Sequence, residues 1–368
     1  MENVFRVAIL GGGGILSAHA PGWLRLRDQC RVVAVAEPAE DQHPRIRAQL
    51  EDEGLPIYTS YVAMLDELGG QLDAVDILLP HDLHLDATLR AAENGLHVLC
   101  EKVMARNVYE ARQMVRACEE AGVKLMVSHD RRYAGDWVTL KKIVDSGQLG
   151  EILFWKMEHN QNVVFPPGAW VRSKDRLGGG AIMSCLTHQI DALRWYGGEV
   201  DSLCCLTKTV PERMEGETIG AITARMESGA LALLSINWHT QSHSWDGTNK
   251  DGLWYEFNHV TGTRGEAYYM HGRGTFVKLF DGPGRTFEYD MQGEGAFECV
   301  KAEYELTGHQ KCIEAFVQAC RGDDAQVLTW GRDTLRTVEV AEAAYIAEAA
   351  GKTVRLPVEP TPWEQRTY

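Results

Sequence analysis

"VAILGGGGILSAHAPGW", residues 7–23, begins as an apolar run, passes through four consecutive glycines and continues as a helix-like stretch. Gly11 and Gly13 match the first two glycines of the pattern G-x-G-x-x-G, while Leu16 occupies the third position. Small residues after a strand let the backbone approach a pyrophosphate, whose charge the N-terminus of the next helix stabilises. The stretch predicts either a dinucleotide-binding turn or a simple tight turn, and the surrounding segments must decide between them.

The segments that follow alternate between strand-like and helix-like patterns. Short runs are apolar at nearly every position, as in strands buried on both faces of a parallel sheet. These runs are "VFRVAIL", "RVVAVAE", "AVDILLP", "HVLCEK" and "KLMVSH". Helix-like stretches over 86–95 and 107–122 each end in a glycine that fits a helix C-cap. The alternation predicts a doubly wound α/β domain over residues 1–130.

A second domain is predicted over residues 131–368. After a helix at 178–196 come strand-like segments separated by turn residues, which is typical of an antiparallel sheet. They are "VDSLCCLTKTV", "IGAITARME", "ALALLSINW", "LWYEFNHVTG", "EAYYMHG", "TFVKLFD" and "RTFEYDM". Helices over 309–320 and 331–350 can cover one face of this sheet. Because exposed apolar sheet surface rarely persists alone, we expect a homodimer or homotetramer that forms through the sheet.

The overall composition excludes several kinds of partner. The formal net charge is -15, from 37 basic and 52 acidic residues, which disfavours nucleic acid. No apolar run reaches membrane-spanning length, so no membrane partner is expected. The nine cysteines form no C-x-x-C pair, and with no leader sequence ahead of the first strand they favour a reducing compartment. We expect a cytoplasmic protein.

The end of the second strand bears on the choice of dinucleotide. Glu37 stands where a carboxylate can accept hydrogen bonds from ribose hydroxyls and repel a 2'-phosphate, which favours NAD over NADP. A solvated acid at a strand end is the alternative interpretation. Arg45 and Arg47 lie close by in the sequence and leave NADP open as the less favoured cofactor.

The ends of the fourth and fifth strands carry polar residues. Pro80, His81, His84, Glu101 and Lys102 all fall at the carboxyl edge of the predicted sheet, where open α/β sheets bind ligands. A lysine that ends a buried strand needs a partner for its ammonium group. That partner is either a ligand or Glu101. His84 either faces a ligand or only begins a helix.

"GGGAIMSCLTHQID", residues 178–191, reads as a glycine turn that continues into a helix. Ser184 and His188 would lie one turn apart on the same face, which suggests a catalytic edge or ordinary packing. The preceding "FPPGAWVRSKD" contains Trp170 and Arg172, which either face the site or pack in the protein interior.

Two further parts of the sequence contain candidate histidines. His239, His243 and His259 have a spacing that suits no standard metal site, so we expect no metal. Trp245 and Asp246 in the same region would suit sugar stacking and hydroxyl recognition. His309 begins a late helix, near a substrate or at the surface.

The ordered set of motifs resembles the glucose-fructose oxidoreductase / inositol dehydrogenase family, also called Gfo/Idh/MocA. The resemblance covers nearly the whole chain. It rests on the glycine loop followed by His19, "PHDLH" at 80–84, "EK" at 101–102, "SHDRRY" at 128–133, the 178–191 stretch and "VTGTRGEA" at 260–267. It implies a Rossmann domain, a larger α/β domain with an open, mainly antiparallel sheet, a nicotinamide cofactor, and hydride transfer at a sugar or cyclitol carbinol.

Four positions depart from the family pattern. The third loop glycine is Leu16, the proline after Glu-Lys is Val103, and an asparagine before the arginine pair is Asp130. The helix commonly carries an aspartate where this chain has Ser184, which can form hydrogen bonds but supplies no charge. Some relatives that act at C3 of a hexose ring have a neutral amide there.

The resemblance and the residues together give the expected site. Lys102 and His188 would be catalytic, with His188 accepting a proton and Lys102 polarising the substrate oxygen. The expected substrate-binding residues are Ser184, Trp170, Arg172, Asp191 and His309. The expected cofactor-binding residues are Gly11, Gly13, Gly14, Ile15, Glu37, Pro80, His81, His84, Glu101, Lys102 and Asp130.

Three functions fit these residues. The first is an NAD-dependent oxidoreductase that acts on a ring hydroxyl of a sugar, glycoside or cyclitol. The second is glycoside cleavage through transient C3 oxidation, elimination, hydration and re-reduction with NAD recycled. The third is a non-catalytic regulator that senses NAD or a sugar, against which the retained Lys102 and His188 argue.

Overall fold

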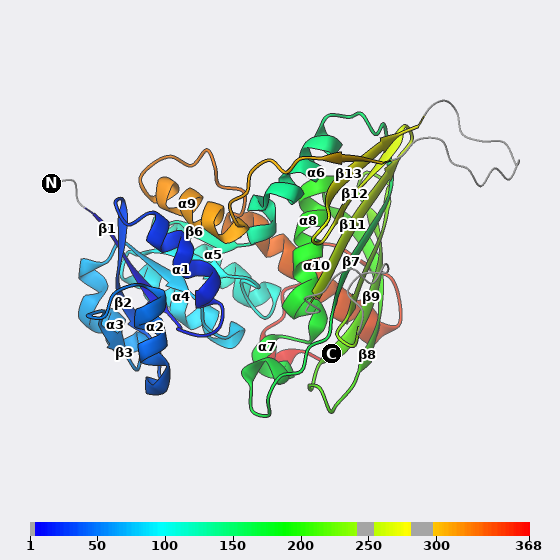
Figure 1. The fold of residues 1–368 in the computed structure, drawn as a ribbon. Coiled ribbons are helices and arrows are strands. Elements are labelled where there is room, and N and C mark those ends of the chain that lie inside the picture. The colour runs from blue at the N-terminus through cyan, green and yellow to red at the C-terminus, as the bar shows by residue number, and fades with distance from the viewer. Residues whose placement is uncertain (1–3, 241–253, 281–296) are drawn as a thin grey trace, which may run out of the picture.

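The chain folds around two sheets with helices packed against each, as Figure 1 shows. The computed structural model describes residues 4–240, 254–280 and 297–368. Within these residues, no helix combines the length and apolarity that crossing a bilayer requires.

The first sheet has six parallel strands in the order β3-β2-β1-β4-β5-β6 within the described part of the chain. This is the doubly wound order of a Rossmann domain, and it confirms the predicted fold class. The strands are β1 (Phe5–Leu10), β2 (Cys30–Ala36), β3 (Ile57–Tyr58), β4 (Ala74–Ile77), β5 (His97–Glu101) and β6 (Leu125–Ser128). The helices between them are α1 (Leu16–Arg25), α2 (His43–Gln49), α3 (Tyr61–Leu68), α4 (His84–Glu93) and α5 (Val108–Glu120).

The local signals in this domain act as the sequence predicts. Every residue of β4 and β6 is buried, as a strand covered by helices on both faces requires. Gly95 and Gly122 follow α4 and α5 with φ angles of 71° and 67°, the left-handed conformation that ends a helix.

The second sheet has nine strands in the order β14-β13-β12-β11-β7-β10-β9-β8-β15 among the described residues. All its pairings are antiparallel except that of β7 with β10, so the sheet is mainly antiparallel as predicted. The strands are β7 (Ile152–Gln161), β8 (Val200–Thr209), β9 (Glu217–Met226), β10 (Leu231–Asn237), β11 (Trp254–Gly262), β12 (Gly265–Met270), β13 (Gly274–Leu279), β14 (Glu298–Val300) and β15 (Val354–Arg355). The expected strand "RTFEYDM" lies outside the described residues.

Helices cover one face of this sheet, the face toward the first domain (Figure 1). They are α6 (Gly135–Asp145), α8 (Thr187–Gly197) and α10 (Gly331–Ala350), while α7 (Lys174–Leu177) lies below them in the connecting segment. The remaining helix, α9 (Gly308–Cys320), returns to the first domain and packs on α1, where Arg25 pairs with Glu314 at 2.5 Å.

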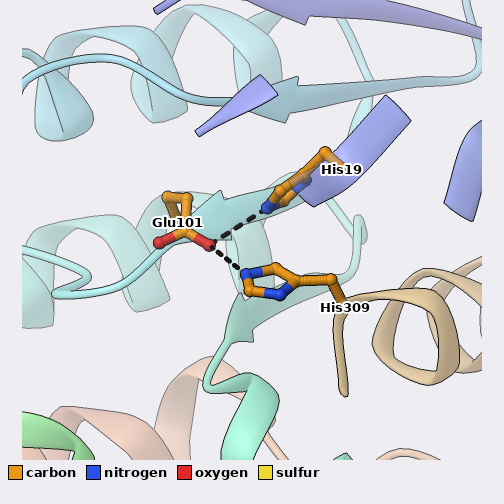
Figure 2. A group of neighbouring side chains, drawn as sticks. All are labelled: His19, Glu101 and His309. Carbon is orange, nitrogen blue, oxygen red and sulfur yellow. Dashed lines mark hydrogen bonds and ion pairs between the residues drawn. The ribbon is translucent and has the colours of Figure 1, made fainter. Parts of the chain in front are cut away.

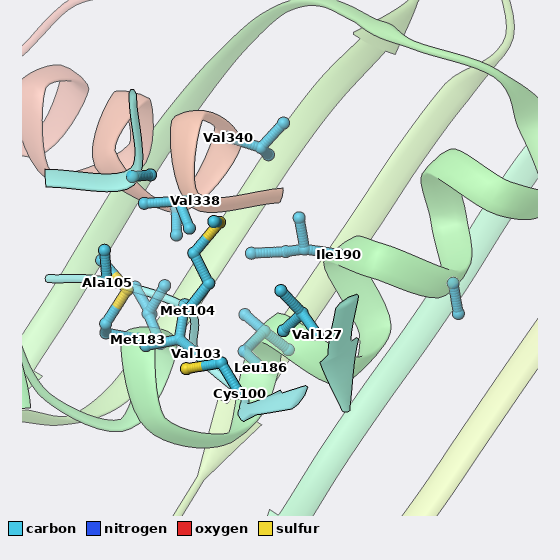
Figure 3. Close-up of a cluster of buried hydrophobic side chains, with 14 of the residues drawn as sticks. Cys100, Val103, Met104, Ala105, Val127, Met183, Leu186, Ile190, Val338 and Val340 are labelled. Carbon is cyan, nitrogen blue, oxygen red and sulfur yellow. The ribbon is translucent and has the colours of Figure 1, made fainter. Parts of the chain in front are cut away.

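The two domains share a hydrophobic core, shown in Figure 3. Cys100 and Val103 near the end of β5 pack with Met183, Leu186 and Ile190 from the helical segment of the second domain. All five side chains are fully buried. This packing brings the carboxyl edge of the Rossmann sheet against the start of α8, where the predicted catalytic residues lie.

Candidate active site

The turn over residues 11–15 joins β1 to α1 and has one packed part and one open part. Gly11 has a φ of 100°, and a Cβ there would lie 2.6 Å from a backbone carbonyl oxygen, so only glycine fits. Gly13 and Gly14 are exposed, and a Cβ on either would meet nothing within 4 Å. Ile15 follows them as the N-cap of α1. The open amides at this helix N-terminus fit the pyrophosphate of a dinucleotide.

Glu37 lies directly after β2 and is fixed beside this turn. Its Oε2 accepts the N–H of Gly12 at 2.9 Å, and its Oε1 accepts the N–H of Ala39 at 2.9 Å. The Arg45 guanidinium donates to the carbonyl of Gly12, and also to the side chains of Gln42 and Gln49. A half-buried carboxylate is therefore fixed beside the glycine turn.

The histidines after β4 are buried and bonded to the backbone. His84 is fully buried, with Nε2 2.8 Å from the Leu79 carbonyl oxygen and Nδ1 3.0 Å from that of Val103. His81 follows the half-buried Pro80 and donates from Nδ1 to the carbonyl of Leu177 at 2.9 Å. Burial, together with the charge of neighbouring groups, lowers the pKa of His81 to about 3. Both rings brace the carboxyl edge of the sheet.

Lys102 connects the Rossmann sheet to the second domain. It follows β5, and its Nζ donates to the carbonyl oxygen of Ser184 at 2.7 Å. Its backbone N–H donates to Oε2 of Glu101 at 3.0 Å. The ammonium group therefore reaches the segment that leads into α8, four residues before His188.

The segment that contains Ser184 is not the continuous α-helix that the sequence predicts. Residues Ile182–Leu186 form a π-helical turn, and α8 begins only at Thr187. The wider turn changes the angle between Ser184 and His188 from that of an α-helical i, i+4 pair. The Ser184 hydroxyl lies 3.6 Å from the Cys185 thiol.

His188 lies at the centre of a group of ionisable side chains. Its Nδ1 is 3.7 Å from Oδ1 of Asp130 and has no hydrogen-bond partner among the described residues. The other oxygen of Asp130 is 3.4 Å from Nδ1 of His309, whose Nε2 is 3.7 Å from Glu101. The structure thus brings Glu101, Asp130, His188 and His309 together near Lys102.

The surroundings of His188 keep its ring neutral. The side chain is 8% exposed, and burial is the main cause that lowers its pKa well below the ordinary value. The positive charges of Lys102 and Arg131 act in the same direction. A neutral imidazole beside an ammonium group can accept a proton, whereas an imidazolium cannot.

Other expected site residues lie in different surroundings. Asp191 is 1% exposed, and both its oxygens accept hydrogen bonds from Arg132. Trp170 packs its ring against His81 at a centroid distance of 5.0 Å. Arg172 donates to the backbone of Glu212 and borders a cavity of about 560 Å³ that Trp170 also lines.

A buried polar group beside His188 was missed from the sequence. His159 on β7 stacks on His188 with ring centroids 6.1 Å apart. Its Nδ1 lies 3.2 Å from the side-chain oxygen of Gln189 and 3.4 Å from Glu256, which also pairs with Arg131 at 3.1 Å. The available signal was a strand whose buried, alternating positions change from apolar to polar toward its end.

His239 and His259, whose spacing suits no standard metal site, have separate partners. Nε2 of His239 is 2.8 Å from the Thr218 hydroxyl, and Nε2 of His259 is 3.0 Å from Glu266. His243, Trp245 and Asp246 lie outside the described residues.

Comparisons with known proteins agree with this architecture. A family model described as "Oxidoreductase family, NAD-binding Rossmann fold" matches residues 5–129, and one described as "GFO/IDH/MocA C-terminal domain" matches residues 137–268. The fold and these matches define an oxidoreductase with an NAD-binding Rossmann domain. The chain belongs to the Gfo/Idh/MocA family, which confirms the resemblance found in the sequence.

Two curated relatives illustrate the range of similarity. An inositol 2-dehydrogenase of Streptomyces avermitilis is 35% identical over 200 residues, which are 54% of this chain and 55% of that protein. The chain therefore spans only about half of that relative. A D-apiose dehydrogenase of Paraburkholderia graminis is 25% identical over 362 residues, covering 96% of this chain and 90% of that protein.

Two solved structures share the fold over almost the full chain. An aldose-aldose oxidoreductase from Caulobacter crescentus gives a TM-score of 0.80 at 23% identity, covering 96% of this chain and 100% of that one. A levoglucosan dehydrogenase in complex with NADH and levoglucosan gives 0.80 at 21% identity, covering 97% and 100%.

Proposed function

We propose that the protein is an NAD-dependent oxidoreductase that oxidises a ring hydroxyl of a sugar, glycoside or cyclitol. The observation that carries the proposal is the bond from Lys102 Nζ to the Ser184 carbonyl, because it delivers an ammonium group to the segment that holds the neutral His188. Relatives named for inositol, apiose and levoglucosan support this substrate class.

Residues of the first domain would hold the cofactor. The amides of Gly13 and Gly14, at the N-terminus of α1, would bind the pyrophosphate. The Glu37 carboxylate would accept hydrogen bonds from the hydroxyls of the adenosine ribose. Because that carboxylate would repel a 2'-phosphate, NAD is favoured over NADP. When bound, the nicotinamide supplies the acceptor for the hydride that leaves the carbinol carbon.

The side chains beside α8 would manage the hydroxyl proton. His188 accepts it, and Lys102 donates a hydrogen bond to the substrate oxygen and stabilises the negative charge that develops there. Asp130, 3.7 Å from His188 Nδ1, stabilises the imidazolium that results. Ser184 would contact another hydroxyl of the substrate, and Trp170 and Arg172 would close the site.

A second copy of the chain is the partner we propose for the uncovered sheet face. Leu206 is 76% exposed and Leu231 is 41% exposed on this sheet. Further along the sheet the rings of Phe257, Tyr268 and Phe276 pack against one another, with centroid distances of 5.7 Å and 4.9 Å. An apolar and aromatic face of this kind is typical of an interface.

The nine cysteines are all unpaired, which supports a reducing, cytoplasmic location.

The test is product analysis by mass spectrometry after incubation with NAD and a panel of sugars, cyclitols and glycosides. A ketone that accumulates with one equivalent of NADH is the expected result. Free sugar and aglycone without net NADH would replace the proposal with redox-assisted glycoside cleavage. NAD binding with no product across the panel would favour a sensor.

Matched variants make this test specific to the site. Lys102→Met and His188→Asn should lower the rate of product formation by about 10²-fold or more while leaving NAD binding measurable by fluorescence titration. Lys142→Met, which removes a largely exposed lysine on α6, should leave the product yield unchanged. Equal loss in all three variants would contradict the assigned roles.

A further inference from the structure

Three side chains from separate elements point toward one another at the edge of the Rossmann sheet, as Figure 2 shows. They are His19 on α1, Glu101 at the end of β5 and His309 at the start of α9. His19 Nε2 is 3.1 Å from Glu101 Oε1, and His309 Nε2 is 3.7 Å from the same oxygen. One nitrogen of each imidazole and one carboxylate oxygen lie within 4.8 Å of one another.

Each histidine is also held from its other side by a carboxylate. Nδ1 of His19 is 2.9 Å from Asp76, and Nδ1 of His309 is 3.4 Å from Asp130. A carboxylate behind each ligating imidazole is the usual outer shell of a protein metal site, where it fixes the ring orientation and raises its basicity. Trp23 donates to the same Asp76 oxygen at 2.7 Å, so this carboxylate is itself fixed.

Glu101 is oriented as a ligand that binds through one oxygen. Its Oε2 accepts the backbone N–H of Lys102, which leaves Oε1 facing the two imidazoles. The separation of 3.7 Å between this oxygen and His309 is longer than a hydrogen bond. His309 therefore faces the carboxylate at ion-pair distance, without a hydrogen bond of normal length.

We propose that His19, Glu101 and His309 form a binding site for one divalent transition-metal cation. Two imidazole nitrogens and one carboxylate oxygen are the ligand set of many zinc sites, with a fourth position left for water. Nitrogen-rich ligands of this kind favour Zn²⁺ or Co²⁺ over Mg²⁺, which requires oxygen ligands. The cation would join α1, β5 and α9, and so fasten α9 to the first domain.

A bound proton is the competing occupant of the same place. In the absence of a cation, a protonated His19 can donate to both Asp76 and Glu101. Metal binding must displace that proton, because an imidazole ligand has to offer a lone pair. Cation binding should therefore release protons, which can be measured.

The experiment uses the full chain after treatment with a chelator and dialysis. Zn²⁺ is titrated in competition with a chromophoric chelator, and Co²⁺ is added separately to record its visible absorption. We expect one tightly bound equivalent of Zn²⁺ per chain. We also expect an intense visible absorption of Co²⁺, typical of a cation with a low coordination number, and a rise in Tm when Zn²⁺ is added. Calorimetry in two buffers of different ionisation enthalpy should show proton release.

Variants separate this site from adventitious binding. His309→Gln and His19→Gln should each lose the tight equivalent, and Asp76→Asn should weaken it about 10- to 100-fold. His43→Gln should bind as the unmodified chain does, because His43 contacts the Glu37 carbonyl instead. His309 has no tight hydrogen bond to lose, so its variant remains informative even where His19→Gln does not fold.

Two results would overturn the proposal. The first is the absence of a tight equivalent in the unmodified chain, which would leave a cluster held by a proton alone. The second is binding that is unaffected in His309→Gln, which would place the cation elsewhere. Neither result bears on sugar oxidation, because the test does not use activity.

Discussion

Arg132 and Asp191 form a bidentate ion pair in which both nitrogen–oxygen distances are 2.8 Å. Arg132 belongs to the turn that follows β6, and Asp191 lies on α8 three residues after His188. Although burial opposes it, the charge and hydrogen bonds of Arg132 hold the pKa of Asp191 below its ordinary value. The pair fixes the helix that carries His188 to the end of the Rossmann sheet.

Breaking this pair should cost stability. Asp191→Ala leaves a buried guanidinium without its main partner, and the free energy of unfolding should fall by about 3–5 kcal/mol in urea titrations. The matched control is Arg116→Ala, which removes an exposed ion pair with Glu120 and should cause no measurable change. Equal effects of the two substitutions would show that the buried pair does not fix the helix.

The proposed base gives a definite pH dependence. Oxidation requires neutral His188, so kcat/KM should be maintained at neutral pH and fall only as the pH drops through a pKa well below 6.5. His188→Asn should lower kcat by about 10²- to 10⁴-fold and remove that limb of the profile. Initial rates measured across pH provide the check. A fall in kcat/KM that begins, as the pH decreases, at or above pH 6.5 in the unmodified enzyme would contradict a neutral buried ring.

Glu217 gives a separate dependence of stability on pH. Its Oε1 accepts the N–H of Ile182 at 2.9 Å and the Tyr345 hydroxyl at 2.8 Å, and burial raises its pKa to about 7. The folded state therefore keeps a proton that the unfolded chain loses near pH 4.5, so this contribution to stability disappears as the pH rises toward 7.

Substitution should remove this dependence. Relative to the unmodified chain, Glu217→Gln should gain stability between about pH 4.5 and 7, with a constant difference above that range. Denaturant titrations at several pH values measure it, with the exposed Glu227→Gln as a control that should leave the dependence unchanged. A constant difference across the whole range would show that folding does not raise the pKa of Glu217.

Glu37 should set the cofactor preference. Glu37→Ser removes the carboxylate that would accept ribose hydroxyls and repel a 2'-phosphate, so the ratio of kcat/KM for NAD to that for NADP should fall about tenfold or more. Glu40→Ser, which changes an exposed residue nearby, should leave the ratio unchanged. Dissociation constants of both dinucleotides provide an independent measure. An unchanged ratio in Glu37→Ser would assign the discrimination to other residues.

The uncovered sheet face should determine the oligomeric state. Leu206→Lys places a charge in the proposed interface, where it would have to be desolvated without a partner, so the assembly should dissociate toward monomer. Light scattering after size-exclusion chromatography measures the mass. Val164→Lys alters a side chain that is 70% exposed in a loop and should leave the mass unchanged. A monomeric unmodified chain would contradict the proposed interface.

Local patterns were sufficient to predict the first domain. Strands covered on both faces are apolar throughout, so β4 and β6 can be predicted from their own residues without knowledge of the neighbouring strands. Leu16 shows why the incomplete glycine pattern still gives the turn, because its side chain is fully buried among residues between α1 and the sheet. The requirement for glycine lies at Gly11, where a Cβ would strike the backbone.

The rest of the site depends on contacts between distant residues, which leave little local trace. The π-helical turn before α8 is fixed by the packing of that segment and by the buried Glu217, whose strand follows α8 in the sequence. The role of the polar positions of β7 could not be predicted from that strand alone, because it depends on the pairing with β11 that places Glu256 beside His159. The fixed, buried position of Asp191 depends on Arg132, 59 residues away in the sequence.

The core in Figure 3 has a consequence for how substrate enters. Because Val103 and Leu186 belong to a single dry interior, separating the two domains would expose apolar surface that now has no contact with water. Hinge opening is the ordinary expectation only where the interface between domains is small or polar. Access to Lys102 and His188 should therefore depend on rearrangement at the rim of the site rather than on separation of the two domains.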